Sequence, residues 1–292
     1  MKKKSSLKHI GAFWAFCAPC CILFGVFFLV PLVLSIAFSF TNYDGWKTMD
    51  FVGLTNYITL FKDSKFYLSL GRTLLYTVCT LPFRVIIPLL VAVLLCSKRV
   101  AGKSLTRTMV YIPVLMSALV VGITINWMFS QEYGLVNFII RSLGGTALEW
   151  SLNPRLATFV IAFASVWASI GFNMILYIGG INSISNDLYE AATIDGASGV
   201  QAFFRITVPM LAPTTFMVVL LSTVNLLKEY ALVQGITQGG PGLSTTFIIQ
   251  YIFDKGFNQM QYGYASAIST VVMIIFALIA FAQFKVNNGG ET

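Results

Sequence analysis

Two short stretches contain residue types that enzymes use as nucleophiles or as phosphate-binding loops. Gly196 to Gly199, GASG, matches the G-x-S-G pattern of intramembrane serine proteases, whose general base is a histidine on another membrane helix. The sequence has one histidine, His9, which lies in the N-terminal tail. Gly239 to Thr246, GGPGLSTT, lacks the lysine of the G-x-x-x-x-G-K-S/T phosphate loop, and no such loop occurs elsewhere. The sequence therefore predicts neither protease chemistry nor an ATP site of its own.

Polar and aromatic side chains follow one face of two otherwise apolar segments. The spacings i, i+4, i+7 in the first segment and i, i+3, i+7 in the second place each set along one side of a helix. The six residues are Ser165, Ser169, Phe172, Ser222, Asn225 and Glu229. Because polar side chains in membrane helices usually face a bundle interior or an aqueous cavity, these faces predict a path for a solute. The alternative is that Ser and Asn only hold neighbouring helices together.

Helices that cross a membrane must position these residues. The 292 residues are 57% hydrophobic and 10% charged, a composition typical of polytopic membrane proteins. Five uncharged runs of about 20 residues or more, and a sixth that only Arg84 interrupts, are long enough to cross about 30 Å of hydrocarbon as helices. These runs lack the alternation of barrel strands. We predict an all-α membrane protein of one domain, residues 1–292, with six helices at about 12–40, 73–97, 108–130, 156–180, 209–233 and 263–284.

The cysteines indicate neither a metal site nor a disulfide framework. They lie inside or at the edge of predicted helices, without metal-like spacing to histidine. The five are Cys17, Cys20, Cys21, Cys79 and Cys96. The basic N-terminus is similar to that of a signal peptide, but the apolar run after it is far longer than the about 7–15 residues of such a peptide. We therefore expect an uncleaved first helix and no bound metal.

Basic residues in the connections indicate the orientation of the helices, because Lys and Arg gather on the cytoplasmic side. One cluster precedes the first helix and another links the second helix to the third. The residues are Lys2, Lys3, Lys4, Lys8, Lys98, Arg99, Lys103 and Arg107. Six crossings then place both termini, and also the segment 185–213, in the cytoplasm. The net charge of +8 fits this bias and does not indicate a nucleic-acid partner.

The segment 185–213 is polar and rich in small residues, although it separates two long apolar runs. Ser185 suits a helix cap, and Asp187 and Glu190 have the spacing of a capping box. Gly196 suits the left-handed position that ends a helix. The segment therefore predicts two short helices with a sharp break between them.

Two aromatic residues lie in the second of these short helices. Phe203 and Phe204 share an apolar face there, and Pro209 and Pro213 precede the fifth membrane helix. A helical hairpin with exposed aromatic side chains is suited to docking into a groove on a soluble partner. The alternative is an interfacial helix that lies on lipid.

The segment resembles the EAA loop of bacterial ABC importer permeases, in particular the carbohydrate branch that carries maltose, oligosaccharides and glycerol phosphate. The similar stretches are LYEAATIDGAS and FFRITVPMLAP, with FVGLTNYITLF, YGLVNFIIRSLGG, ITQGGPGLSTTF and GYASAIS in the expected order. The resemblance covers nearly the whole chain. It implies a cytoplasmic loop that couples to the ATPase, for which we expect the residues Glu190, Ala191, Ala192, Asp195, Gly196, Ala197, Phe203, Phe204 and Pro209.

The resemblance implies a transport subunit and not an enzyme. Such a permease lies in the bacterial cytoplasmic membrane as a multi-pass protein, in contact with lipid. It pairs with a second permease subunit, as a rule a different chain, and with two cytoplasmic ABC ATPase subunits that bind ATP and Mg. An extracytoplasmic binding protein delivers the sugar, and no cofactor binds this chain. The alternative is a self-contained secondary transporter, for which we would expect inverted repeats and broken helices; no internal repeat is evident.

Three charged residues fall within predicted membrane helices. Counted at about 1.5 Å per residue from Pro213, Lys228 and Glu229 lie about 22–24 Å from the inner face, and Arg84 lies about 16 Å from the start of its own helix. Glu229 is then about 10 Å too close to the outer face to pair with Arg84. We therefore expect a backbone carbonyl or the other permease to be the partner of Arg84.

Overall fold

The computed structural model describes residues 14, 16–46, 49–97 and 102–288. Within these residues the protein consists of helices and connections, with one isolated β-bridge between Thr41 and Phe51. The all-α prediction is therefore confirmed. His9 and several of the basic residues used for orientation lie outside the described residues, namely Lys2, Lys3, Lys4, Lys8, Lys98 and Arg99.

The described residues contain enough apolar helix for up to six membrane spans. Four helices qualify alone, Phe16–Phe38, Ser64–Cys96, Pro154–Asn182 and Tyr262–Val286. Two further spans consist of helix pairs that bend sharply, by 102° between Lys103–Leu115 and Ala118–Met128, and by 66° between Gly199–Met210 and Ala212–Leu227. The two bends were not predicted.

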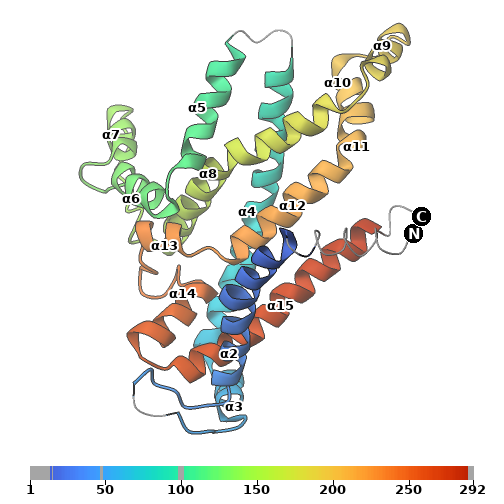
Figure 1. Cartoon of the computed structure of the whole chain (residues 1–292). Coiled ribbons are helices and arrows are strands. Elements are labelled where there is room, and N and C mark those ends of the chain that lie inside the picture. Colours follow the sequence, from blue (N-terminus) through green and yellow to red (C-terminus); the bar gives the residue numbers. More distant parts are fainter. Residues whose placement is uncertain (1–13, 15, 47–48, 98–101, 289–292) are drawn as a thin grey trace, which may run out of the picture. The chain divides into compact units, whose positions relative to one another are not determined.

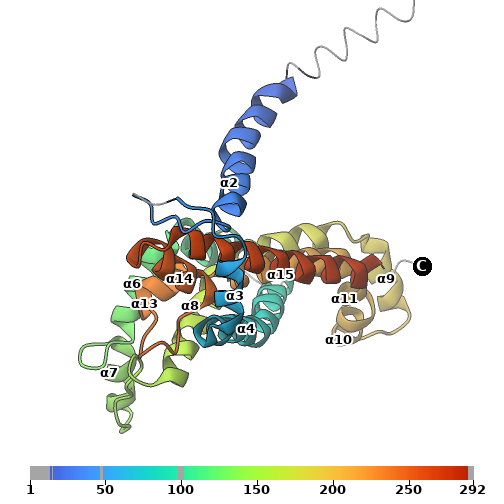
Figure 2. The ribbon, with the colours of Figure 1, turned by 90° about the horizontal axis from the view of Figure 1, so that it is seen from below.

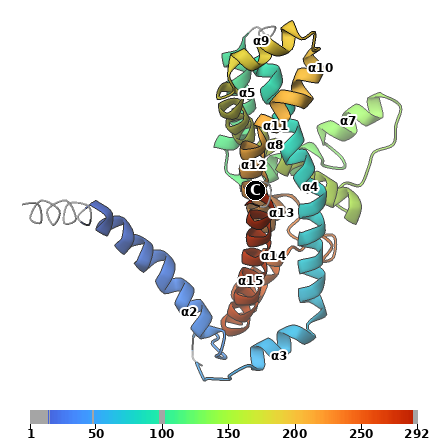
Figure 3. The same cartoon turned by 90° about the vertical axis from the view of Figure 1, so that its right-hand side faces the viewer.

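The second span, α4 (Ser64–Cys96), begins nine residues before the predicted start at residue 73. The prediction took Lys65 and Arg72 as the end of the apolar run, but charges end only the hydrophobic part of a helix and not the helix itself. Pro82 and Pro88 lie inside α4, which Figure 3 shows as one continuous helix.

The third predicted helix, 108–130, is broken in the structure. α5 (Lys103–Leu115) and α6 (Ala118–Met128) are separated by Met116 and Ser117, whose ψ angles of 146° and 135° are extended. Pro113 lacks the N–H that would continue the helical hydrogen bonds and lies shortly before the break. Hydropathy does not detect such a break, because the residues around it remain apolar.

The fifth predicted helix, 209–233, is also interrupted. α12 (Ala212–Leu227) ends before Lys228, and α13 (Ala231–Ile236) resumes three residues later. The bend before α12 lies at Leu211. Pro209 and Pro213 are the second residues of the helices on its two sides, α11 (Val208–Met210) and α12. Proline fits the first turn of a helix, so these residues begin new helices instead of continuing one.

The chain divides into two compact units, of which unit 1 comprises Met1–Ser64 and Ile252–Ile275. Its described helices include a short π-helix (η1, Gly25–Leu29), α2 (Val30–Phe38), α3 (Thr55–Lys62), another short π-helix (η3, Asp254–Asn258) and the first half of α15 (Tyr262–Asn288). The side chain of Asn56 donates to the carbonyls of Ser39 and Thr41, at 2.9 and 2.8 Å. Tyr264 donates to Asp63 at 2.7 Å. These bonds hold α3 to the end of α2, and the start of α15 to the end of α3.

Unit 2 comprises Lys65–Tyr251 and Phe276–Thr292 and contains the segments discussed below. It contains α4 from Lys65 onward, α5, α6, α12 and α13, together with α7 (Leu135–Ser142), α8 (Pro154–Asn182) and most of α14 (Ile248–Phe253). α8 packs against α5 so closely that a Cβ at Gly171 would lie 2.7 Å from the carbonyl oxygen of Val110. Figure 2 shows α6, α7 and α13 toward one end of α8 and the hairpin 186–210 at its other end.

Candidate functional site

The segment between α8 and α12 forms the helical hairpin that its sequence predicts. α9 (Asn186–Ile194) is followed by α10 (Gly199–Ala202), a short π-helix (η2, Phe203–Thr207) and α11 (Val208–Met210). Ser185 caps α9 by accepting from the N–H of Asp187 at 3.2 Å. Gly196 has φ = +77°, which confirms the left-handed position expected for it.

The capping box does not form where we predicted it. Asp187 lies inside the first turn of α9, because Ser185 already occupies the cap position. A capping box forms instead at the start of α10, where Ser198 and Gln201 exchange bonds of 2.7 and 3.3 Å with each other's backbone. This second box fixes the direction in which the chain leaves the turn at Gly196.

Most of the hairpin residues that the sequence singled out are exposed. Glu190, Ala191, Asp195, Gly196, Phe204 and Pro209 are exposed, whereas Ala192, Ala197 and Phe203 are half-buried. Phe204 is 64% exposed, and its ring meets that of Phe203 at 4.9 Å in an edge-on arrangement. A hydrogen bond of 2.9 Å between the hydroxyls of Tyr189 and Thr207 holds the two arms together. The hairpin therefore presents a carboxylate, small residues and an aromatic ring on a braced support.

The end of α4, the start of α5 and the hairpin lie at the same end of unit 2 (Figure 1). The sequence placed both connections on one side of the membrane, from the parity of the crossings. This shared position agrees with that parity.

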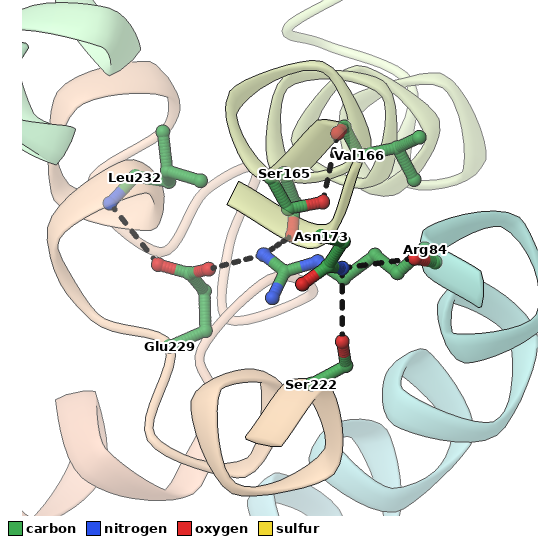
Figure 4. Close-up of polar contacts among 8 residues, drawn as sticks. Arg84, Ser165, Val166, Asn173, Ser222, Glu229 and Leu232 are labelled. Carbon is green, nitrogen blue, oxygen red and sulfur yellow. Dashed lines mark hydrogen bonds and ion pairs between the residues drawn. The ribbon is translucent and has the colours of Figure 1, made fainter. Parts of the chain in front are cut away.

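A second group of polar side chains lies inside unit 2, between α4, α8 and the break that follows α12 (Figure 4). Arg84 is 6% exposed and Glu229 is 9% exposed, and Nη2 of Arg84 lies 3.7 Å from Oε2 of Glu229. The same Nη2 donates to the hydroxyl of Ser165, which is fully buried. The N–H of Leu232, at the start of α13, donates to the other carboxylate oxygen of Glu229 at 3.4 Å.

Asn173 extends this buried group to α12. Its Nδ2 donates to the backbone carbonyl of Arg84 at 2.9 Å and to the hydroxyl of Ser222 at 3.2 Å. One asparagine thus links α4, α8 and α12. Asn173 is not among the six residues of the two predicted faces, because its partners lie on other helices.

The expectation that Glu229 cannot reach Arg84 is wrong. That expectation takes residue 73 and Pro213 as the ends of straight helices at the membrane edges. α4 in fact begins at Ser64, and α12 follows a 66° bend. Neither segment is therefore a straight helix that rises from the residue used as its start, and the two heights do not give the distance between the side chains.

The six residues predicted to line a solute path divide into two sets. Ser165, Ser222 and Glu229 are buried and bonded within the chain, as the helix-holding alternative requires. Ser169 is half-buried and donates to the carbonyl of Val166 at 2.8 Å, Phe172 is 42% exposed, and Asn225 is exposed. Only this second set remains accessible from outside the chain.

A cavity of about 640 Å³ lies beside this region, between α4 and α8. Its walls are mainly apolar and include Phe83, Phe159 and Phe163, with Arg72 and Arg155 in its lining. None of the six predicted solute residues lines it. In the part of the chain that the structure describes, no group of three His, Cys, Asp or Glu side chains could hold a metal ion.

Known proteins resemble this chain along nearly its full length. Residues 54–288 match the family model described as a binding-protein-dependent transport system inner membrane component. The chain is 32% identical over 279 residues to the arabinooligosaccharides transport system permease protein AraP of Bacillus subtilis (strain 168), covering 94% of this chain and 88% of that one. It is also 32% identical over 276 residues to the lactose transport system permease protein LacF of Rhizobium radiobacter, covering 93% and 92%.

A solved structure has the same fold. It is a chain in the crystal structure of a bacterial alginate ABC transporter in complex with an alginate pentasaccharide-bound periplasmic protein, with a TM-score of 0.84, 23% identity, and coverage of 97% of this chain and 96% of that one. At this identity the likeness supports the fold alone. The family model and the two permeases together show that this chain belongs to the family of binding-protein-dependent transport system inner membrane components, which are membrane subunits of transporters.

Proposed function

We propose that this chain is the membrane-spanning permease subunit of an ATP-driven importer that moves a sugar or oligosaccharide into the cytoplasm by alternating access. Family membership supports the transport role. The two similar permeases are named for the transport of arabinooligosaccharides and of lactose, which supports a sugar as the solute. The observation that carries the ATP-driven part is the exposed hairpin with Glu190 and Phe204, braced by Tyr189 and Thr207.

The proposed partners follow from this role. Two cytoplasmic ATPase subunits bind ATP and Mg and receive the hairpin, a second permease completes the solute path, and an extracytoplasmic binding protein delivers the sugar. The solved alginate transporter, in complex with its periplasmic protein, supports the last of these partners. This chain itself binds no cofactor in the proposed complex.

A self-contained secondary transporter is the second candidate, because its helices are often broken near the membrane midplane, and two spans are broken here. The hairpin favours the ATP-driven importer, since a self-contained transporter has no soluble subunit for it to bind. We expect the tagged chain, solubilised in mild detergent, to co-purify with an ATPase subunit. Recovery of a stable chain that transports sugar without any such subunit would favour the secondary transporter.

We further propose that both termini and the hairpin lie in the cytoplasm. In a background without the five native cysteines, a cysteine at Ser198 or Lys103 should resist impermeant thiol reagents in intact cells. A cysteine at Asp63 or Gly242 should react in the same cells. Permeabilised cells provide the control, because both sets should then be labelled. Labelling of position 198 from outside the intact cell would exclude both this orientation and the docking role of the hairpin.

Finally, we propose that the accessible residues of the two predicted faces, Ser169, Phe172 and Asn225, contact the solute. A sugar offers hydroxyl groups and flat apolar ring faces, which amide and hydroxyl groups and an aromatic ring can bind. Ser165, Ser222 and Glu229 would then support this surface from behind, through the bonds described above.

A further inference from the structure

The interruption of the fifth span coincides with a buried pair of charges. α12 ends at Leu227, α13 begins at Ala231, and Glu229 lies between them within 3.7 Å of Arg84 on α4. A charge buried to this extent is unfavourable unless another charge compensates it. The pair therefore allows Glu229 to lie inside the protein at the break, and it links the segment before α13 to α4.

α13 is joined so tightly to α6 that the two helices form one packed piece. A Cβ at Gly235 would lie 2.8 Å from the carbonyl oxygen of Leu119 and 2.9 Å from the Cα of Gly122. A Cβ at Gly122 would in turn lie 3.0 Å from the Cα of Gly235. The backbones of the two helices are thus in direct contact, with no side chain between them at these glycines. α6 begins after the break at Met116 and Ser117, just as α13 begins after the break that follows Leu227. The packed piece therefore consists of the parts of two spans that follow their breaks.

The distance between the charged groups of Arg84 and Glu229 is longer than that of a direct hydrogen bond. Charged nitrogen–oxygen hydrogen bonds are about 2.7–2.9 Å long, which is shorter than the 3.7 Å seen here. Nε of Arg84 is buried and has no hydrogen-bond partner among the described residues. Arg84 is also bonded to α8, because the same Nη2 donates to Ser165 and the backbone carbonyl of Arg84 accepts from Asn173. A movement of α13 by about 1 Å would therefore form a closer contact without moving α4 or α8.

We propose that Arg84 and Glu229 are positioning residues for the translocation step, an inference that rests on the proposed function. The pair sets where the packed piece of α6 and α13 lies against α4 and α8, and it tightens or loosens as that piece moves between the two access states. Asn225 lies one turn before Glu229 on the same span. The movement would therefore reach a residue proposed to contact the solute.

The test uses the complete complex in lipid nanodiscs, with spin labels on cysteines at Ile123 in α6 and Phe163 in α8, both exposed side chains. The probe is Mg-ATP with vanadate, so the identity of the sugar does not matter. The wild-type complex should give two different label distances, one without nucleotide and one in the trapped state. R84M/E229M removes both charges, so it should assemble, but it should give one broad distribution in both conditions. In a separate assay in sealed vesicles, with the transported sugar and its binding protein, the maximal uptake rate of this variant should fall at least tenfold.

Two further variants separate positioning from a merely structural role. R84K keeps the charge opposite Glu229, so it should retain two distances. R141M removes an exposed arginine on α7 and should behave as wild type. If R84M/E229M shows the wild-type change of distance and wild-type uptake, the inference is wrong. If the wild-type complex itself does not respond to nucleotide, the proposed function fails instead.

Discussion

Replacing Gly196 with valine should uncouple ATP hydrolysis from sugar uptake while leaving membrane insertion normal. Gly196 has φ = +77°, a region in which a side chain with a Cβ costs about 1–2 kcal/mol. A Cβ at this position would meet no atom within 4 Å, so the strain acts on the backbone of the turn alone. About 1.4 kcal/mol corresponds to tenfold in an equilibrium. We therefore expect stimulation of the ATPase by the loaded binding protein to fall about tenfold in reconstituted vesicles.

Gly199 provides a matched control in the same hairpin. It is also exposed, a Cβ there would meet no atom within 4 Å, and its φ is not positive. Gly199→Val should therefore keep stimulation within about twofold of wild type, since valine is no worse than glycine in a helix. Stimulation of the ATPase in Gly196→Asn should lie between the values of the two valine variants, because asparagine tolerates the left-handed region. Wild-type stimulation in Gly196→Val would show that the hairpin does not couple the ATPase to transport.

Replacing Asn225 with tryptophan should reduce uptake at least tenfold without loss of the ATPase subunits. Asn225 is exposed on α12, in a span whose exposed neighbours Met217 and Leu221 are apolar. An amide is costly in lipid, so it should face an aqueous path or another subunit. A tryptophan there would fill the space that the sugar needs.

The control for Asn225→Trp is Leu278→Trp on α15. Leu278 is 62% exposed among apolar side chains, as expected of a surface that faces lipid, so this variant should keep normal uptake. The two variants are compared by initial uptake rate and by recovery of the ATPase subunit in the same preparation. Normal uptake by Asn225→Trp, and by Ser169→Trp as well, would mean that both faces only hold helices together.

The class of fold and the hairpin followed from simple features of the sequence. Apolar runs of membrane-spanning length predicted helices, and Gly196 predicted the left-handed turn because no other residue type adopts it so easily. The breaks at Met116–Ser117 and after Leu227 were not predicted. Hydropathy measures how apolar a segment is and contains no information on the direction of its backbone.

The buried group at Arg84 could be predicted only in part. Its charge within an apolar run indicated that a partner must exist. The identity of that partner depended on where α4 begins and on how far the fifth span bends, which no local pattern gives. Serine and asparagine at helical spacing were equally ambiguous. Ser165 and Ser222 turned out to bond within the chain, whereas Asn225, three residues after Ser222, is exposed.

The most direct test of the proposed importer is the energy source of uptake. The chain is co-reconstituted into vesicles with its second permease and ATPase subunits, and uptake of labelled lactose and arabino-oligosaccharides is measured with a binding protein present. We predict uptake of at least one sugar that requires ATP on the ATPase side and the binding protein, and that continues when ionophores remove all ion gradients. Uptake by this chain alone, driven by an ion gradient without ATP, would contradict the proposed function.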